Sequence, residues 1–240
     1  MNRHVGGVLL GLLGAALLKI SATDLYLNYV KASMRPWLLL TGAVLLALGI
    51  WSLVDVVRSA AADEAHDDED DDGHGHAGLP RTAWLLLVPV LAVLLIAPPP
   101  LGGYAAEREQ STTLPPATQS DLPPIPPGDP SVLALSDFAV RAVWDDGRTL
   151  AGKPVELTGF ASAAPDGGWY LTRLALTCCA ADATATKVTV VGASFAPKTN
   201  TWVTVVGEWT PGGGTESVTA VPRVKAASMK VVPQPKYPYE

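Results

Sequence analysis

Residues 37–54 read WLLLTGAVLLALGIWSLV, an apolar run with no charged side chain before Asp55. A helix needs about 20 apolar residues to cross the hydrocarbon core of a bilayer, so this run predicts a membrane span at 37–55. Two more apolar segments flank it in the sequence. VGGVLLGLLGAALL begins at Val5, and AWLLLVPVLAVLLIA begins at Ala83. We therefore expect an α-helical membrane region (1–100) with three spans at about 5–23, 37–55 and 83–98.

The outer two segments allow other interpretations. Arg3 followed by an apolar stretch is also the pattern of a signal peptide, but Lys19 near its end and the span that follows favour a retained helix. The third segment is short before Pro98, so it needs tilt or a thinned bilayer. A buried core helix is the alternative for any such run. Small residues four apart, which let helices pack closely in lipid, are Gly7, Gly11, Ala15, Ala43 and Ala47.

The composition excludes several classes of protein. The chain has 240 residues, a net charge of −6, 48% hydrophobic residues and 17% charged residues. Soluble domains carry roughly a quarter charged residues, so the whole chain is too apolar for one soluble globule. Two cysteines cannot form a disulfide framework. Residues 103–240 contain 11 basic and 13 acidic residues, a balance that argues against nucleic acid as a partner.

Membrane orientation is not fixed by the charges next to the spans. With three spans, Arg3, Arg58 and Arg81 lie on one side, and the other side holds Lys19, Lys31 and Arg35. The positive-inside rule is therefore undecided. The segment after the third span is rich in Pro, Thr and Ser and poor in Lys, as in many extracytoplasmic stalks. We expect a multi-pass protein of the bacterial cell membrane with an extracytoplasmic C-terminal domain.

An acidic, histidine-bearing linker (58–82) joins the second and third spans. Residues 63–76 read DEAHDDEDDDGHGH, with eight carboxylates, three histidines and no apolar period, which predicts a solvated loop. Imidazole and carboxylate ligate divalent metals such as zinc. His66, His74 and His76 are therefore candidate ligands of a weak, flexible metal site. The alternative is an acidic spacer that keeps the spans apart.

The rest of the chain is a Pro-rich stalk (101–130) followed by a domain of strands (131–240). Ser136 is a candidate N-cap for a short helix, DFAVRAVWDD. Five strands are then expected at 154–162, 169–177, 187–193, 201–210 and within 218–233, separated by Gly-marked turns. This order predicts an all-β domain, an OB-like barrel with one short helix. A β-sandwich is the alternative.

The two cysteines of the chain are adjacent, in LTCCAADA (176–183). Neighbours on a strand point to opposite faces, so one of Cys178 and Cys179 is expected to face the core. Cys179 and Asp182 are candidate metal ligands, although two ligands do not make a site. The alternatives are a Cys that packs as a small hydrophobe beside an Asp that caps a turn, a redox role, or a vicinal disulfide. Every histidine precedes residue 77, so the β domain cannot assemble a Ser-His-Asp or Cys-His catalytic group.

With these features in order, the chain resembles the YcgQ-like family of uncharacterised bacterial membrane proteins. The matching stretches are GKPVELTGF (152–160), the tetrad from Cys179 to Asp182, TWVTVVGEW (201–209) and VPRVKAASMKVVPQPKYPY (221–239). The resemblance implies a multi-pass membrane protein that is the companion of a predicted permease. It also implies a link to metal ions, through the family's His-rich linkers. It implies no enzymatic role.

Three functions follow as hypotheses. The first is a non-enzymatic accessory subunit of a permease-type transport system, linked to divalent metal. The second is an envelope protein whose β domain binds a surface component. The third is a redox or metal-dependent enzyme that uses Cys178, Cys179 and Asp182, which a thiol of low pKa would favour.

Overall fold

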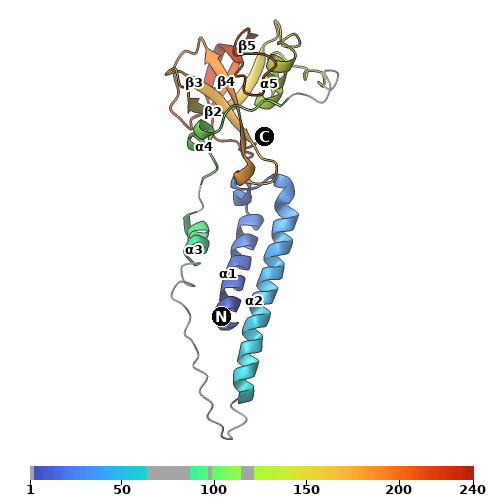
Figure 1. Cartoon of the computed structure of the whole chain (residues 1–240), viewed down its shortest axis with the longest axis vertical. Coiled ribbons are helices and arrows are strands. Elements are labelled where there is room, and N and C mark those ends of the chain that lie inside the picture. The colour runs from blue at the N-terminus through green and yellow to red at the C-terminus, as the bar shows by residue number, and fades with distance from the viewer. Residues whose placement is uncertain (1–2, 64–86, 97–98, 115–121) are drawn as a thin grey trace. The chain divides into compact units, whose positions relative to one another are not determined.

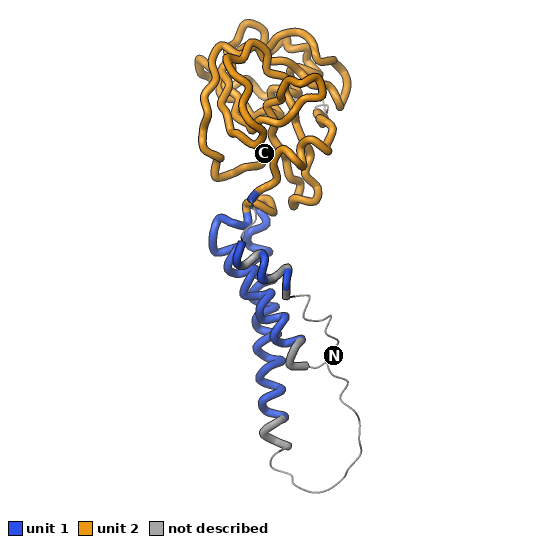
Figure 2. Tube along the Cα trace, turned by 90° about the vertical axis from the view of Figure 1, so that its left-hand side faces the viewer, with its two compact units in different colours: residues 1–26, 32–99 blue, residues 27–31, 100–240 orange. Residues whose placement is uncertain are grey.

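The computed structural model describes residues 3–63, 87–96, 99–114 and 122–240. The chain divides into two compact units (Figure 2), one of residues 1–26 and 32–99 and one of residues 27–31 and 100–240. Residues 27–31 thus belong to the second unit although they connect two helices of the first. Figure 1 shows the helices of the first unit and the sheet of the second.

Two long helices, α1 (Arg3–Ala22) and α2 (Arg35–Asp63), pack against each other in the first unit. The 3-10 turns η1 (Asp24–Asn28) and η2 (Ala32–Met34) connect them. Glycines allow backbone contact, since a Cβ on Gly14 would lie 2.6 Å from the Leu46 nitrogen and one on Gly49 would lie 2.6 Å from the Gly11 nitrogen. The close approach therefore uses Gly42 and Gly49 of α2. The small residues expected at the helix contact on this helix, Ala43 and Ala47, are exposed, as is Ala15 of α1.

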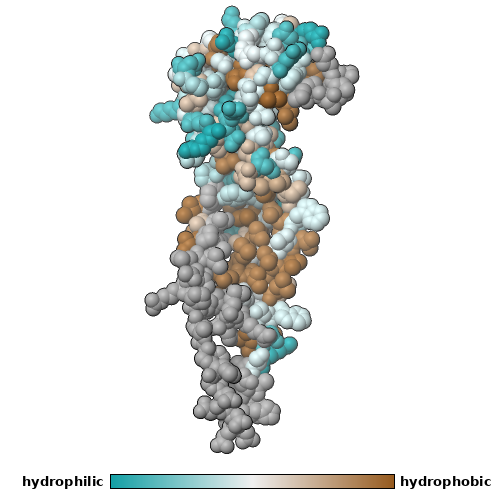
Figure 3. Space-filling view, in the orientation of Figure 1, coloured by the Kyte–Doolittle hydropathy of each residue, from teal (hydrophilic) through white to brown (hydrophobic). Residues whose placement is uncertain are grey.

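The apolar helices of the first unit can be compared with the three expected membrane spans. Within the described residues, one helix is long and apolar enough to cross a membrane, at Ala32–Ser59, and Gly6–Ala22 is a shorter apolar helix. Hydrophobic residues dominate the visible helix surface in Figure 3. The third expected span, 83–98, contains the ten-residue helix α3 (Leu87–Ile96). Its other residues, 83–86 and 97–98, lie outside the described ranges. The structure thus supports fewer spans than the three expected. Helix α2 also runs to Asp63, so the linker expected from residue 58 begins as helix.

The second unit is built on a five-stranded barrel, which confirms the expected barrel and excludes the β-sandwich alternative. Antiparallel pairing joins β2 (Val155–Ala163) to β3 (Trp169–Ala175) and β3 to β4 (Thr184–Val191). Strand β4 pairs parallel with β6 (Arg223–Val231), and β6 pairs antiparallel with β5 (Trp202–Thr210). Pairing of β5 with β2 closes the barrel, and the short β1 (Ser131–Leu133) adds to β2 in parallel.

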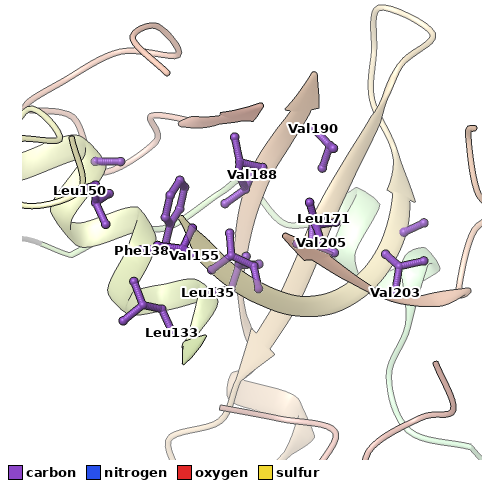
Figure 4. Close-up of a cluster of buried hydrophobic side chains, with 14 of the residues drawn as sticks. Leu133, Leu135, Phe138, Leu150, Val155, Leu171, Val188, Val190, Val203 and Val205 are labelled. Carbon is purple, nitrogen blue, oxygen red and sulfur yellow. The ribbon is translucent and has the colours of Figure 1, made fainter. Parts of the chain in front are cut away.

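The barrel core forms because inward-facing residues alternate along the strands, as Val203 and Val205 do on β5. Helix α5 (Leu135–Trp144) contributes Leu135 and Phe138, both fully buried, to this core (Figure 4). The expected N-cap role of Ser136 is wrong. The helix begins at Leu135 and its first free amides, on residues 135 and 136, donate to the carboxylate of Glu240 at 2.9 and 3.0 Å.

Residues expected to form a stalk are part of the second unit from residue 100 onward. Helix α4 (Gly103–Arg108) buries Ala106 completely against a small core cluster formed by Phe160, Leu174 and Ala185. After it, Ser111 forms a parallel bridge with Ala185, and the Thr112 amide donates to the Ala185 carbonyl at 2.7 Å. The compact unit therefore begins before residue 131, and its barrel carries an added segment on β4.

Candidate metal-binding turn

The two cysteines lie in the connection between β3 and β4, residues 176–183, here called the Cys–Asp turn. Strand β3 ends at Ala175 and the 3-10 turn η5 (Ala180–Asp182) follows Cys179. Cys178 and Cys179 are therefore not strand residues, and the expectation that they alternate between two faces of a strand is wrong. Cys178 is exposed and Cys179 is partly buried.

The carboxylate of Asp182 organises this turn. Its Oδ1 accepts the backbone amide of Thr177 at 2.8 Å, and its Oδ2 accepts those of Cys178 at 2.8 Å and Cys179 at 3.4 Å. The Asp182 amide in turn donates to the Cys179 carbonyl at 3.1 Å. Three amide donors on one carboxylate fix the backbone of the turn, which is the capping role considered for Asp182 from the sequence.

The turn brings both sulfurs next to this carboxylate. One ligand atom from each of Cys178, Cys179 and Asp182 lies within 4.8 Å of the others. The sequence placed Cys179 and Asp182 among the candidate ligands, and the structure adds Cys178 to the group. The other candidates, His66, His74 and His76, lie outside the described residues.

The geometry of the turn shifts the pKa values of Cys178 and Asp182 in opposite directions. The Cys178 thiol donates a hydrogen bond to the Asp182 carboxylate, which, with the Cys179 side chain and partial desolvation, raises the pKa of Cys178 to about 11. The same hydrogen bond, together with the backbone amides, lowers the pKa of Asp182 to about 2. At neutral pH the turn therefore holds a protonated Cys178 beside an ionised carboxylate, which is the opposite of an activated thiolate.

Residues 29–31 complete the turn from far away in the sequence. The Ala180 amide donates to the Tyr29 carbonyl at 2.7 Å, and the Lys31 amide donates to the Cys178 carbonyl at 3.1 Å. Val30 and Cys179 thus form an antiparallel bridge. Nothing in the local sequence of 27–31 indicates this pairing, because the partners are some 150 residues apart.

The hydroxyl of Tyr239 joins three segments of the same unit. It accepts the Leu101 amide at 2.8 Å and donates to the Asn28 carbonyl at 2.9 Å. Tyr239 itself is bridged to Leu174 of β3. The residue after it, Glu240, caps α5 and lies 3.5 Å from the Arg173 guanidinium. Sequence reasoning missed both residues, although the closing Pro-Tyr pair was among the stretches that carry the family resemblance.

The donor set of the turn fits a divalent metal such as zinc. Two thiols and a carboxylate are zinc ligands, and three protein ligands with an open fourth position are a known arrangement for this ion. The Asp182 oxygens already accept backbone amides, so a metal would share this carboxylate with the turn. A metal would also displace the proton of Cys178, because only a thiolate ligates.

Comparison with known proteins gives a family match for the C-terminal region. Residues 140–240 match the family model described as the DUF1980 C-terminal domain, an uncharacterised family. The match covers the barrel strands, the Cys–Asp turn and the closing Tyr239–Glu240 pair. Comparisons with curated proteins and with solved structures gave no match.

Proposed function

We propose that the chain is a non-enzymatic accessory subunit of a permease-type transport system in the bacterial cell membrane. In this function the Cys–Asp turn binds a divalent metal such as zinc. The observation that carries the proposal is the grouping of Cys178, Cys179 and Asp182 within 4.8 Å. This group is hydrogen-bonded to residues 29–31, which connect the two N-terminal apolar helices.

The same hydrogen bonds support a second crossing between residues 31 and 100 if α2 crosses the membrane, and a crossing by α1 would complete the three expected spans. Residues 27–31 and 100–240 form one compact unit, so they lie on one side of the bilayer. Helix α2 has 29 residues, a length of roughly 43 Å at about 1.5 Å per residue, enough to cross. A chain that crosses in α2 must cross again before residue 100, and the apolar segment that contains α3 is the candidate for that return.

This topology separates the two candidate metal sites. The linker with His66, His74 and His76 would lie on the side opposite the β domain, so it cannot share an ion with the Cys–Asp turn. The Pro-, Thr- and Ser-rich sequence after residue 100 favours an extracytoplasmic β domain. Metal on one side would then reach the Cys–Asp turn, and on the other side the acidic, histidine-bearing sequence of the linker.

Two features support a non-enzymatic role. The exposed thiol of Cys178 has a pKa raised to about 11 by the neighbouring carboxylate, so it lacks the thiolate character of a catalytic cysteine. The β domain sequence also contains no histidine to serve as its base. These features favour ligand binding over nucleophilic or redox chemistry at the turn.

The metal proposal is tested by Zn²⁺ titration of the full chain in detergent micelles. Above any weak binding by the linker histidines, we expect one tight site that is lost in Cys178→Ser, Cys179→Ser and Asp182→Asn, and kept in the control Asp166→Asn, which changes another turn aspartate. Affinity should rise with pH, because binding releases the Cys178 proton. Unchanged stoichiometry in the two cysteine variants would remove the metal from the proposal.

The partner proposal needs a separate experiment. Affinity purification of the tagged chain from membranes, followed by mass spectrometry, should enrich a multi-spanning permease over a control with an unrelated three-span protein. The absence of any enriched permease would contradict the accessory role and leave metal binding at the turn unaffected.

A further inference from the structure

The barrel carries a cavity of about 550 Å³ that is separate from the Cys–Asp turn. It lies over β3 and β4, between the β2–β3 connection at Ala163–Pro165, the β5–β6 connection and the segment 107–111. The volume falls within the range of about 300–1,000 Å³ that is typical of small-ligand sites. All of these residues belong to the second compact unit.

Lys187 places a buried positive charge at this cavity. The residue is only 8% exposed, and its ammonium donates one hydrogen bond, to the Glu109 carbonyl at 2.6 Å. Within the described part of the chain, no carboxylate oxygen lies within the 4.0 Å limit of an ion pair with it. An ammonium has three N–H donors, and a buried charge without a counterion is costly. Burial accordingly lowers the pKa of Lys187, and only the more distant Glu107 and Glu109 act against this.

The other lining groups suit a hydroxylated ligand. The half-buried ring of Tyr170 lies beside Lys187, with the ammonium 5.9 Å from the ring centroid, and offers a flat apolar surface. Exposed carboxylates of Glu107 and Glu109 at the rim accept hydrogen bonds from hydroxyl groups. The two acidic and two basic residues of the lining balance in charge, whereas a polyanion such as a nucleic acid requires an excess of Lys and Arg.

We propose that this cavity binds a saccharide of about two sugar units that carries one carboxylate. The carboxylate pairs with the Lys187 ammonium, a sugar face lies on Tyr170, and hydroxyls bond to Glu107 and Glu109. Five-stranded Greek-key barrels bind oligosaccharides with this part of the sheet and its loops. The site goes beyond the accessory function, does not depend on metal at the Cys–Asp turn, and gives the second sequence hypothesis, an envelope-binding β domain, a specific ligand class.

The test uses ligand-observed NMR and calorimetry on the full chain in lipid nanodiscs. The probes are the disaccharide of N-acetylglucosamine and N-acetylmuramic acid and, as its neutral counterpart, the disaccharide of two N-acetylglucosamine units. We expect the acidic probe to bind about tenfold or more tightly, because a hydrogen bond to a buried charge is strong. Equal affinities, or no binding of either probe, would overturn the proposal.

Two variants separate the roles of the lining residues. Lys187→Met keeps the buried aliphatic stem and should abolish the preference for the acidic probe, whereas the control Lys198→Met, on an exposed loop, should not. Tyr170→Leu should weaken both probes by a similar factor, and it replaces the lysine variant as the test if Lys187→Met does not fold. Binding that is unchanged in Tyr170→Leu would contradict the assignment of the cavity.

Discussion

The reactivity of Cys178 tests the geometry of the Cys–Asp turn most directly. The perturbation is Asp182→Asn in a Cys179→Ala background, so that one thiol is observed and the side chain keeps its shape. The pKa of Cys178 is raised from 9.0 to about 11, with the hydrogen bond to Asp182 as the largest cause. Asparagine removes the negative charge, and we expect this pKa to fall toward its ordinary value.

The magnitude follows from the thiolate fraction. At pH 8, a fall in pKa from about 11 to about 9 increases the thiolate population by roughly 100-fold. The thiolate of lower pKa is also a weaker nucleophile, by roughly eightfold over two units at a Brønsted slope of about 0.45. The two factors together set an upper limit of about 10-fold on the acceleration of alkylation, because the Cys179→Ala parent already lacks the Cys179 part of the shift and desolvation retains another part.

The assay is the rate of iodoacetamide alkylation between pH 7 and 10.5, followed by mass spectrometry of the full chain in detergent. The matched control is Asp166→Asn in the same background, which should leave the rate unchanged because Asp166 lies in the β2–β3 turn. A rate in Asp182→Asn equal to or below that of the Cys179→Ala parent would refute the hydrogen bond between thiol and carboxylate.

Three further results are expected. Tyr239→Phe removes an acceptor for Leu101 and a donor for Asn28, so the second unit should lose about 1–3 kcal/mol in thermal unfolding, while Tyr237→Phe, at an exposed ring, should lose nothing measurable. Alkaline phosphatase fused after residue 240 should be active and the same fusion within the 63–76 linker inactive, with the reverse pattern contradicting the proposed orientation. Because the pKa of Asp182 is lowered to about 2, its stabilisation is complete above about pH 4 and is lost as the pH falls toward 2; acid unfolding of Asp182→Asn should lack this component, and an identical acid profile would contradict it.

The barrel was predictable because its signal is local. Strand β5 alternates buried Val203 and Val205 with half-exposed neighbours, and a period of two is readable from the sequence alone. The strand ends were less accurate. The last strand begins at Arg223, several residues after the start of the predicted segment, because residues 211–222 form the turn-rich connection from β5.

The contacts that shape the candidate site were not predictable, because they are distant in sequence. Ser136 satisfies the local rule for an N-cap, yet the carboxylate of Glu240, more than 100 residues away, takes the amides at 2.9 and 3.0 Å. A charged acceptor that bonds two amides at a helix N-terminus outcompetes a hydroxyl there. Likewise, the pairing of Cys179 with Val30 leaves no pattern in either segment.

The geometry of the turn also separates the alternatives that the sequence left open for its three chemical groups. Capping accounts for Asp182, whose carboxylate accepts three amides. Packing as a small hydrophobe accounts for Cys179, which is partly buried, but it does not account for Cys178, whose side chain is exposed. The backbone of the turn is held by Asp182 and by residues 29–31, and the Cys179 side chain takes part in the capping box with Asp182. Cys178 is therefore the group that capping and packing leave unexplained, and the metal that we propose at this turn would have to displace its proton.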